Sequence, residues 1–241
     1  MNPGDDMDRI PEVVINQSDD VRVIALEENI LRANEYTAAE VRASLLEKNI
    51  IALNLISSPG AGKTSLLVRT LQAIGNEIAC AVIEGDQQTS NDAVRIARTG
   101  VPVVQVNTRQ ACHLNALQIK SALDELPLDE IQLLLIENVG NLTCPAGMDL
   151  GESEKIVLMS ITEGEDKPAK YPLAFHLATA LVLTKMDLLP HLRFDLNLCR
   201  QYVERVNPRL KLIETSSYQQ DGLDSWLEFL RFRVARGLSS Y

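Results

Sequence analysis

Residues 57–64, with the sequence Ser-Ser-Pro-Gly-Ala-Gly-Lys-Thr, have the composition of a nucleotide phosphate site. They lie between an apolar run, 50–56, and a helix-like stretch that begins at Ser65. In that context a Gly-rich turn directs backbone N–H groups at phosphates, Lys63 can reach the β- and γ-phosphates, and the Thr64 hydroxyl can ligate Mg²⁺. The general pattern begins with Gly, whereas this chain has Ser57. We nevertheless predict a phosphate-binding loop. The residues expected to contact the nucleotide are Pro59, Gly60, Ala61, Gly62, Lys63, Thr64 and Ser65.

Two acidic residues follow other strand-like runs and could serve the same site. Asp86 comes after the apolar run 78–83, and Glu137 comes directly after 131–136. Ligands of open α/β folds bind at the carboxyl ends of the strands, where Asp86 could hold Mg²⁺ or orient water and Glu137 could act as a supporting carboxylate. Gly140 would let the backbone approach the γ-phosphate. We predict catalytic roles for Lys63, Asp86 and Glu137, although acids at strand ends also often cap helices.

A third motif, Thr-Lys-Met-Asp at 184–187, indicates guanine as the base. It follows the apolar run 177–183. Asp187 can accept two hydrogen bonds from guanine, from N1–H and the amino group, a pair that adenine does not offer, and the stem of Lys185 can lie over the base. Ser216 and Ser217 end the next predicted strand and could close the pocket through their backbone N–H groups, but serine pairs are also ordinary turn residues.

Cysteine and histidine residues form a separate candidate metal site. Cys112 and His113 precede a helix-like run, 114–126, and Cys144 follows the segment 137–143. Thiolate and imidazole ligands suit Zn²⁺ or Ni²⁺, and a helix N-terminus at Cys112 would favour its thiolate. The spacing fits two loop cysteines and a capping histidine equally well. Three ligands leave a metal cage incomplete, so a symmetric dimer is its natural completion. The remaining cysteines, within apolar segments, are expected to pack in the core: Cys80 and Cys199.

Composition limits the partners. The 241 residues include 46% hydrophobic residues, enough for one sizeable α/β domain. A net charge of −10 argues against nucleic acid or an anionic membrane as the main partner. No apolar run approaches the length of a membrane span, and the acidic residues 1–8 lack the features of a signal peptide. Four scattered cysteines suit a reducing compartment, so we expect a cytoplasmic protein.

Alternation of apolar runs with amphipathic stretches predicts an α/β fold, a mainly parallel sheet flanked by helices. Residues 1–20 are expected to form a flexible arm, and residues 50–241 the nucleotide domain. Between them, 21–49 is predicted to form two helices, because apolar residues recur at helical spacing and Thr37 with Glu40 resembles a capping box. The predicted strands are 50–56, 78–83, 101–106, 131–136, 177–183 and 210–214, with a further one at 156–161.

From residue 21 to the C-terminus the chain resembles the HypB family, the GTP-hydrolysing accessory proteins for nickel insertion into [NiFe]-hydrogenase. The Cys-His-Leu and Asn-Leu-Thr-Cys-Pro segments are the most specific matches. The matching stretches are 54–64, 84–86 with 91–93, 105–116, 137–146 and 183–190.

The resemblance implies a P-loop GTPase of the SIMIBI class that dimerises with GTP and carries a metal site at the dimer interface. Cys112, His113 and Cys144 would be the ligands, in or beside nucleotide-sensitive segments, so that hydrolysis alters the metal site. The implied partners are a HypA-like nickel chaperone and the [NiFe]-hydrogenase large-subunit precursor. Many family members carry an N-terminal cluster of Cys or His. Residues 1–79 contain neither residue type, so no separate high-affinity nickel site is expected there.

The sequence is also compatible with three alternatives. A urease accessory GTPase of the UreG type shares the fold but has a Cys-Pro-His triplet, whereas here His113 directly follows Cys112. A P-loop kinase would prefer ATP and use its cysteines structurally. A binding module could keep a vestigial nucleotide site. The ligand types fit nickel and zinc equally.

Overall fold

The computed structural model describes residues 17–219 and 222–237. The chain divides into two compact units, residues 1–33 and residues 34–241. The described part of the first unit is helical and belongs to α1, Gln17–Glu47, which continues into the second unit. The second unit contains the sheet and every candidate site residue.

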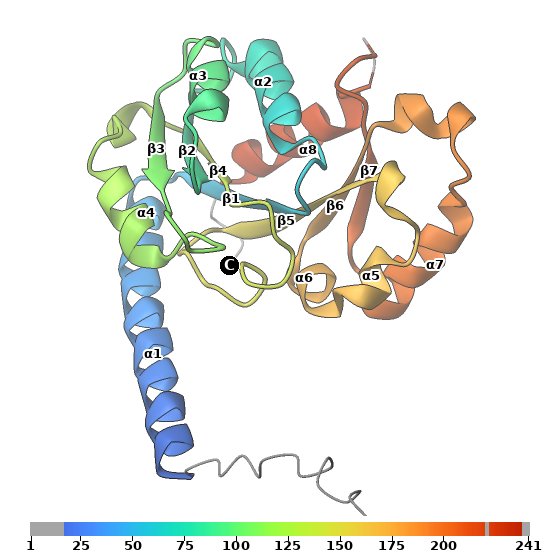
Figure 1. Cartoon of the computed structure of the whole chain (residues 1–241). Helices are drawn as coiled ribbons and strands as arrows, with labels where there is room; N and C mark the ends of the chain where they lie inside the picture. The colour runs from blue at the N-terminus through green and yellow to red at the C-terminus, as the bar shows by residue number, and fades with distance from the viewer. Residues whose placement is uncertain (1–16, 220–221, 238–241) are drawn as a thin grey trace, which may run out of the picture. The chain divides into compact units, whose positions relative to one another are not determined.

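The sheet is the centre of this unit (Figure 1). Its seven strands lie in the order β3-β2-β4-β1-β5-β6-β7, and every pair of neighbours is parallel. The first strand is therefore central, and the strands continue outward on both sides of it. The strands are β1 Ile51–Ser57, β2 Cys80–Asp86, β3 Val103–Asn107, β4 Leu133–Glu137, β5 Glu154–Ser160, β6 Ala180–Thr184 and β7 Lys211–Glu214.

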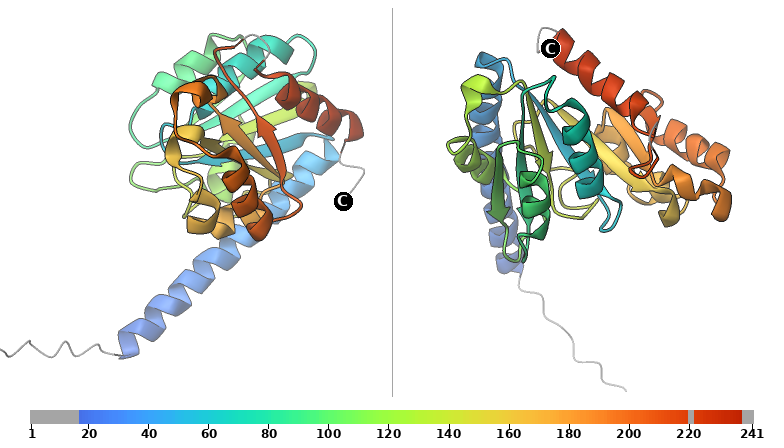
Figure 2. Two further views of the ribbon diagram at one scale, coloured as in Figure 1. Left: turned by 90° about the vertical axis from the view of Figure 1, so that its right-hand side faces the viewer. Right: turned by 90° about the horizontal axis from the view of Figure 1, so that it is seen from above.

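Helices cover both faces of the sheet, which explains why the central strands are buried on both sides (Figure 2). In β1, Leu53 and Leu55 pack with α2, Lys63–Ile74, and α8, Asp224–Arg236. Residues of the opposite face pack with the helices at 116–123, 172–177 and 196–206 and with the part of α1 that lies in the second unit, whereas Ile96 packs on the same face as α2. The other helices are α3 Asn91–Ala97, α4 Ala116–Leu123, α5 Lys167–Lys170, α6 Pro172–Leu177 and α7 Leu196–Val206; the 3₁₀ helices are η1 Leu128–Glu130, η2 Ile161–Glu163 and η3 Met186–His191.

The α/β class and the mainly parallel sheet are confirmed, but one prediction for the N-terminal region is wrong. Residues 21–49 do not form two helices, because a single helix, α1, runs through both predicted segments. No Gly or Pro interrupts the chain there, so nothing ends a helix before Thr37. From Asn34 onward, Ala38, Val41 and Leu45 bury one face of α1.

The boundaries of the arm and of the predicted strands also change, the strands by up to three residues at either end. Residues 17–20 of the predicted arm are helical, and residues 1–16 lie outside the described part of the chain. The predicted strand 177–183 begins later, at Ala180, because Leu177 is the last residue of α6. No helix of the described residues is long and apolar enough to cross a membrane.

Candidate functional site

The predicted phosphate loop connects central strand β1 to helix α2. Gly60 and Gly62 adopt φ angles of +75° and +94°, which favour glycine, and Gly62 is the N-cap residue of α2. Lys63 is buried, and its Nζ donates a hydrogen bond of 2.8 Å to Ser57 Oγ. Burial lowers the pKa of Lys63. Ser57, which replaces the usual first Gly, therefore supplies an acceptor for the loop lysine.

A cavity of about 430 Å³ lies over this loop. Its walls come from the loop, the carboxyl ends of β2, β4 and β6, and helix α3. The predicted site residues that line it are Pro59, Gly60, Gly62, Lys63, Thr64, Ser65, Asp86, Glu137, Gly140 and Lys185. Three others lie outside the lining: Ala61, Asp187 and Ser216. The structure thus brings most of the predicted nucleotide residues together at one edge of the sheet.

Glu137 and Thr64 form the polar contact at the floor of the cavity. Thr64 Oγ1 donates a 2.7 Å hydrogen bond to Glu137 Oε1, whereas Glu137 Oε2 is buried with no partner among the described residues. Burial raises the pKa of Glu137 to about 7, against the opposing charge of Lys63. A hydroxyl and an unpaired carboxylate oxygen are hard oxygen ligands, so this pair fits Mg²⁺.

Asp86 also lines the cavity, but its oxygens are engaged in the turn that follows β2. They accept hydrogen bonds from Gln87 N, Thr89 N and Thr89 Oγ1, at 2.7, 2.9 and 2.8 Å. Burial acts to raise the pKa of Asp86, but the bonds from Thr89 and Gln87 outweigh it and the pKa is lowered. Asp86 is therefore ionised and held in place at the cavity wall, and its proposed contact with Mg²⁺ or water stays a prediction.

Several cavity residues were not predicted from the sequence, and Glu84 is the most unusual of them. Glu84 lies within β2, is almost fully buried, and has an unpaired Oε2. Burial and then the neighbouring charge of Glu137 raise its pKa to about 8. A lone carboxylate continuing an apolar run was the signal that could have identified it. Two further cavity residues come from α3, where Arg95 Nη1 lies 2.9 Å from Asp92 Oδ1.

The predicted base-binding motif lies beside the phosphate loop. Thr184 Oγ1 donates to Ala61 O at 2.6 Å, and Lys185 Nζ donates to Gly60 O at 2.9 Å. Ser216 Oγ donates to Asp187 Oδ1 at 2.5 Å. The backbone N–H of Ser216 is already bonded to Gly222 O. Ser216 therefore orients the carboxylate that is predicted to bind the base, and its own N–H is not available to the nucleotide. The neighbouring Ser217 lines the cavity.

Cys112, His113 and Cys144 lie close together, as the predicted metal site requires. Their donor atoms all lie within 4.8 Å of one another, and Cys112 Sγ is 3.5 Å from His113 Nδ1. This is the only cluster of its kind within the described residues. Burial lowers the pKa of His113, which favours the neutral imidazole that binds metals. Two thiols and an imidazole fit Ni²⁺ or Zn²⁺.

One prediction about this cluster is wrong. Helix α4 begins at Ala116 with Asn115 as its N-cap, so Cys112 does not lie at the helix N-terminus. Its pKa is raised, chiefly by the hydrogen bond with the Cys144 thiol and then by burial. A thiolate at Cys112 would therefore need a bound cation in place of a helix dipole.

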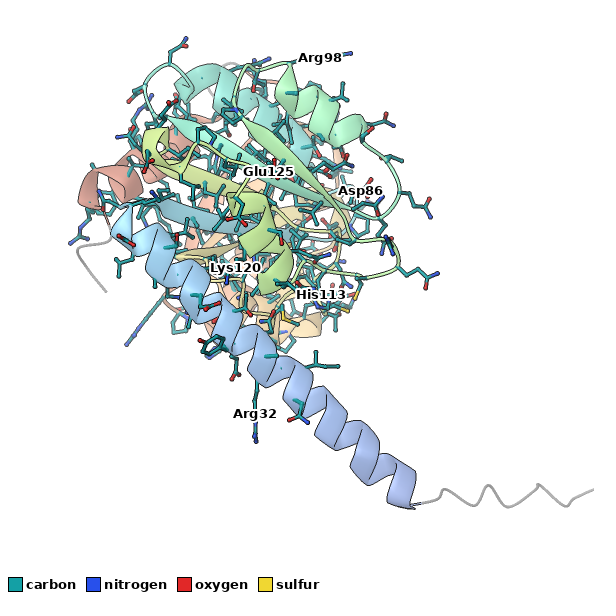
Figure 3. All side chains as sticks on the ribbon, turned by 90° about the vertical axis from the view of Figure 1, so that its left-hand side faces the viewer. Arg32, Asp86, Arg98, His113, Lys120 and Glu125 are labelled. Carbon is teal, nitrogen blue, oxygen red and sulfur yellow. The ribbon has the colours of Figure 1, made fainter. Side chains whose placement is uncertain are left out.

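The metal cluster and the phosphate loop are joined by the chain that follows β4. A Cβ on Gly140 would lie 3.1 Å from Pro59 Cα, so the two segments touch. Asn141 forms an isolated β-bridge with Ser57. Figure 3 shows Asp86 and His113 toward the same side of the domain. The candidate nucleotide and metal sites are therefore neighbours at the carboxyl edge of the sheet.

Comparison with known proteins agrees with this geometry. Residues 51–214 match the family model described as CobW/HypB/UreG, nucleotide-binding domain. The hydrogenase maturation factor HypB of Azotobacter chroococcum mcd 1 is 50% identical over 216 residues, which cover 89% of this chain and 71% of that protein. The chain belongs to the HypB family. Members of this family are GTPases, and the match favours the GTPase interpretation over a P-loop kinase.

Solved HypB structures have the same fold. The structure of HypB from Helicobacter pylori in complex with nickel has a TM-score of 0.81 and 36% identity, covering 85% of this chain and 96% of that chain. HypB from Archaeoglobus fulgidus gives a TM-score of 0.79 at 36% identity, covering 85% of this chain and 100% of that chain. The prediction of a P-loop fold of this family is confirmed.

Proposed function

We propose that this HypB-family chain is a GTP-hydrolysing metallochaperone that delivers nickel to the [NiFe]-hydrogenase large-subunit precursor. In this proposal the GTP-bound chain forms a homodimer in the cytoplasm, receives nickel from a HypA-like chaperone, and releases it after hydrolysis. The observation that carries the proposal is the joining of the two candidate sites through Gly140 and Asn141. A conformational change in the phosphate loop would therefore displace the segment that carries Cys144.

The residues at the cavity divide the work of binding and hydrolysis. Lys63 would neutralise the β- and γ-phosphates, and the left-handed Gly60 and Gly62 would open the loop so that backbone N–H groups converge on them. Asp187, oriented by Ser216, would read the guanine edge. Asp86 would orient the attacking water, because its carboxylate is fixed and ionised beside the cavity.

Thr64 and Glu137 would hold Mg²⁺, the first through its hydroxyl and the second through its unpaired Oε2. The ion supplies positive charge that stabilises the phosphate oxygens during transfer. Glu137 itself keeps the Thr64 hydroxyl aimed, and its burial excludes water from that contact.

Nickel is the cargo in this proposal, and Cys112, His113 and Cys144 would bind it. Three donors per chain leave coordination positions open, and a two-fold dimer would supply donors from both chains. Because a structural zinc site is normally closed by four ligands of one chain, a site with three donors per chain that is completed only in the dimer is better suited to transfer.

The test measures Ni²⁺ and Zn²⁺ dissociation constants and oligomeric state with Mg·GDP and with a non-hydrolysable GTP analogue. We expect dimers and altered metal affinity with the analogue only. Lys63→Ala should abolish both effects, and Cys112→Ala should abolish metal binding. Cys199→Ala removes a buried cysteine outside the cluster and is the matched control, which should retain metal binding. Equal metal affinity and equal oligomeric state with both nucleotides would refute the proposal and favour a binding module.

A further inference from the structure

The strand order creates a geometric problem at the metal cluster. Cys112 and His113 follow β3, whereas Cys144 follows β4, and β2 lies between these strands. The segment after β3 must therefore cross the end of β2 to bring the ligands together. It crosses at Gly85, where an added Cβ would lie only 2.8 Å from Leu114 Cγ. Gly85 also lines the nucleotide cavity.

Leu114, the residue after His113, is fixed at this crossing from two sides. Its side chain is fully buried against Gly85. Its backbone N–H donates a 3.1 Å hydrogen bond to Asn138 Oδ1, the side chain that follows Glu137. The same Oδ1 accepts the N–H of Val139 at 3.0 Å. The metal-binding segment is thus attached to both acidic strand ends of the cavity, β2 and β4.

The side chain of Asn138 is itself held by a series of buried hydrogen bonds. Its Nδ2 donates to Asn54 Oδ1 at 3.2 Å, and Asn54 Nδ2 donates to Glu152 Oε1 at 3.1 Å. Lys155 Nζ, 2.6 Å from Glu152 Oε1, compensates the buried charge. Asn54 lies in the centre of β1 and is fully buried. Satisfied buried amides of this kind fix a single geometry instead of adding much stability.

We infer that Asn138, oriented by Asn54 and closed over by Leu114, is a positioning residue that couples the nucleotide cavity to the Cys112/His113/Cys144 cluster. The path is short: Thr64 bonds to Glu137, Asn138 is the next residue, and its amide holds the residue next to His113. Because Leu114 is close-packed, a displacement of β4 or Gly85 cannot be absorbed gradually and moves His113 with it. This inference rests on the proposed coupling of nucleotide and metal.

The experiment uses the full chain and measures the Ni²⁺ dissociation constant with Mg·GDP and with a Mg·GTP analogue. The ratio of the two constants is the coupling factor, for which roughly 5–150-fold is typical of coupled sites. In Asn138→Ala the factor should fall toward one. Leu114→Ala keeps its backbone N–H but empties the contact over Gly85, so its factor should fall as well. By reciprocity, nickel should shift the ratio of the affinities for the GTP analogue and for GDP by the same factor in each protein.

Asn115→Ala is the matched control, because it removes the α4 cap one residue beyond Leu114 and leaves the contacts of Asn138 intact. It should lower the melting temperature and retain the wild-type factor. Wild-type coupling that persists in both Asn138→Ala and Leu114→Ala would overturn this inference alone. A wild-type factor of one would overturn the proposed function and this inference with it. Loss of coupling in Asn115→Ala as well would mean that general loosening is responsible, which also overturns the inference.

Discussion

Replacing Glu137 with Gln should separate the stability of this protein from its activity. Gln keeps a carbonyl oxygen that can accept the Thr64 hydroxyl, now 2.7 Å from Glu137 Oε1, but it carries no charge. Two opposite effects are expected. The nucleotide-free protein should become more stable at neutral and alkaline pH, whereas Mg²⁺-dependent hydrolysis should fall.

The size of the stability effect follows from the pKa of Glu137, which burial raises from 4.5 to about 7. Between these values the unfolded chain has lost its proton while the folded protein retains it. Because the folded state then binds more protons, stability falls as pH rises through this window. The loss amounts to roughly 3 kcal/mol, is absent below pH 4.5 and is complete above pH 7. The glutamine side chain of Glu137→Gln does not titrate, so the variant does not undergo this loss of stability.

Urea unfolding of the nucleotide-free proteins at pH 5 and pH 8 measures this difference. The stability of Glu137→Gln relative to wild type should rise by roughly 2–3 kcal/mol between the two pH values. Turnover at saturating Mg·GTP should fall by roughly 10–150-fold, the equivalent of one lost charge-assisted interaction. Glu130→Gln, an exposed glutamate of η1, should change neither quantity and controls for net charge.

A relative stability that is the same at both pH values would refute the argument, because Glu137 would then not be held protonated by burial. Unchanged turnover would show that its carboxylate takes no part in hydrolysis. Glu84 is expected to add to the same pH trend, since its pKa of about 8 is also raised. A Glu84→Gln variant would therefore reduce the remaining pH dependence above pH 7.

Three further predictions concern other parts of the domain. Alkylation followed by mass spectrometry should modify Cys112 and Cys144 and spare the buried Cys80 and Cys199. Burial raises the pKa of Cys80 to about 12 and that of Cys199 to about 11, so neither forms the reactive thiolate. Equal alkylation rates at all four cysteines would contradict this prediction. Asp187→Asn should weaken GDP binding by at least roughly 100-fold in a fluorescence titration, because two charge-assisted bonds to guanine are lost, and an unchanged GDP affinity would remove Asp187 from the site. Trp226→Phe should lower the urea-derived stability by about 2 kcal/mol without altering hydrolysis, since it loses the 2.9 Å bond to Thr70 Oγ1; no loss would mean that this bond contributes nothing.

Much of the fold could be predicted because the strands are nearly continuous apolar runs, which a two-sided parallel sheet requires. The phosphate loop could be recognised because few other functions need Gly and Lys at that spacing between a strand and a helix. The cluster residues could be named by type, but their proximity depends on the strand order β3-β2-β4. That order is a tertiary property, which spacing along the chain does not contain.

The errors have identifiable physical causes. A threonine followed three residues later by glutamate is compatible with the inside of a helix, so the motif at Thr37 did not mark a boundary. The signal for Glu84 was a lone carboxylate in an apolar strand, but the strand pattern alone does not show that this carboxylate lines the nucleotide cavity. Ser57 looked like a departure from the phosphate-loop pattern, yet its hydroxyl accepts the bond from Lys63.

The parallel topology has a consequence for how the protein is made. Every neighbouring pair of strands is joined through a crossover or a long connection, and the residues that line the cavity extend from Pro59 to Tyr218. Sheets built from such distant segments fold slowly, and chains emerge from the ribosome N-terminal end first. The phosphate loop is therefore synthesised long before the segment that completes the base pocket. A nascent chain can form the complete cavity only after Tyr218 has been translated.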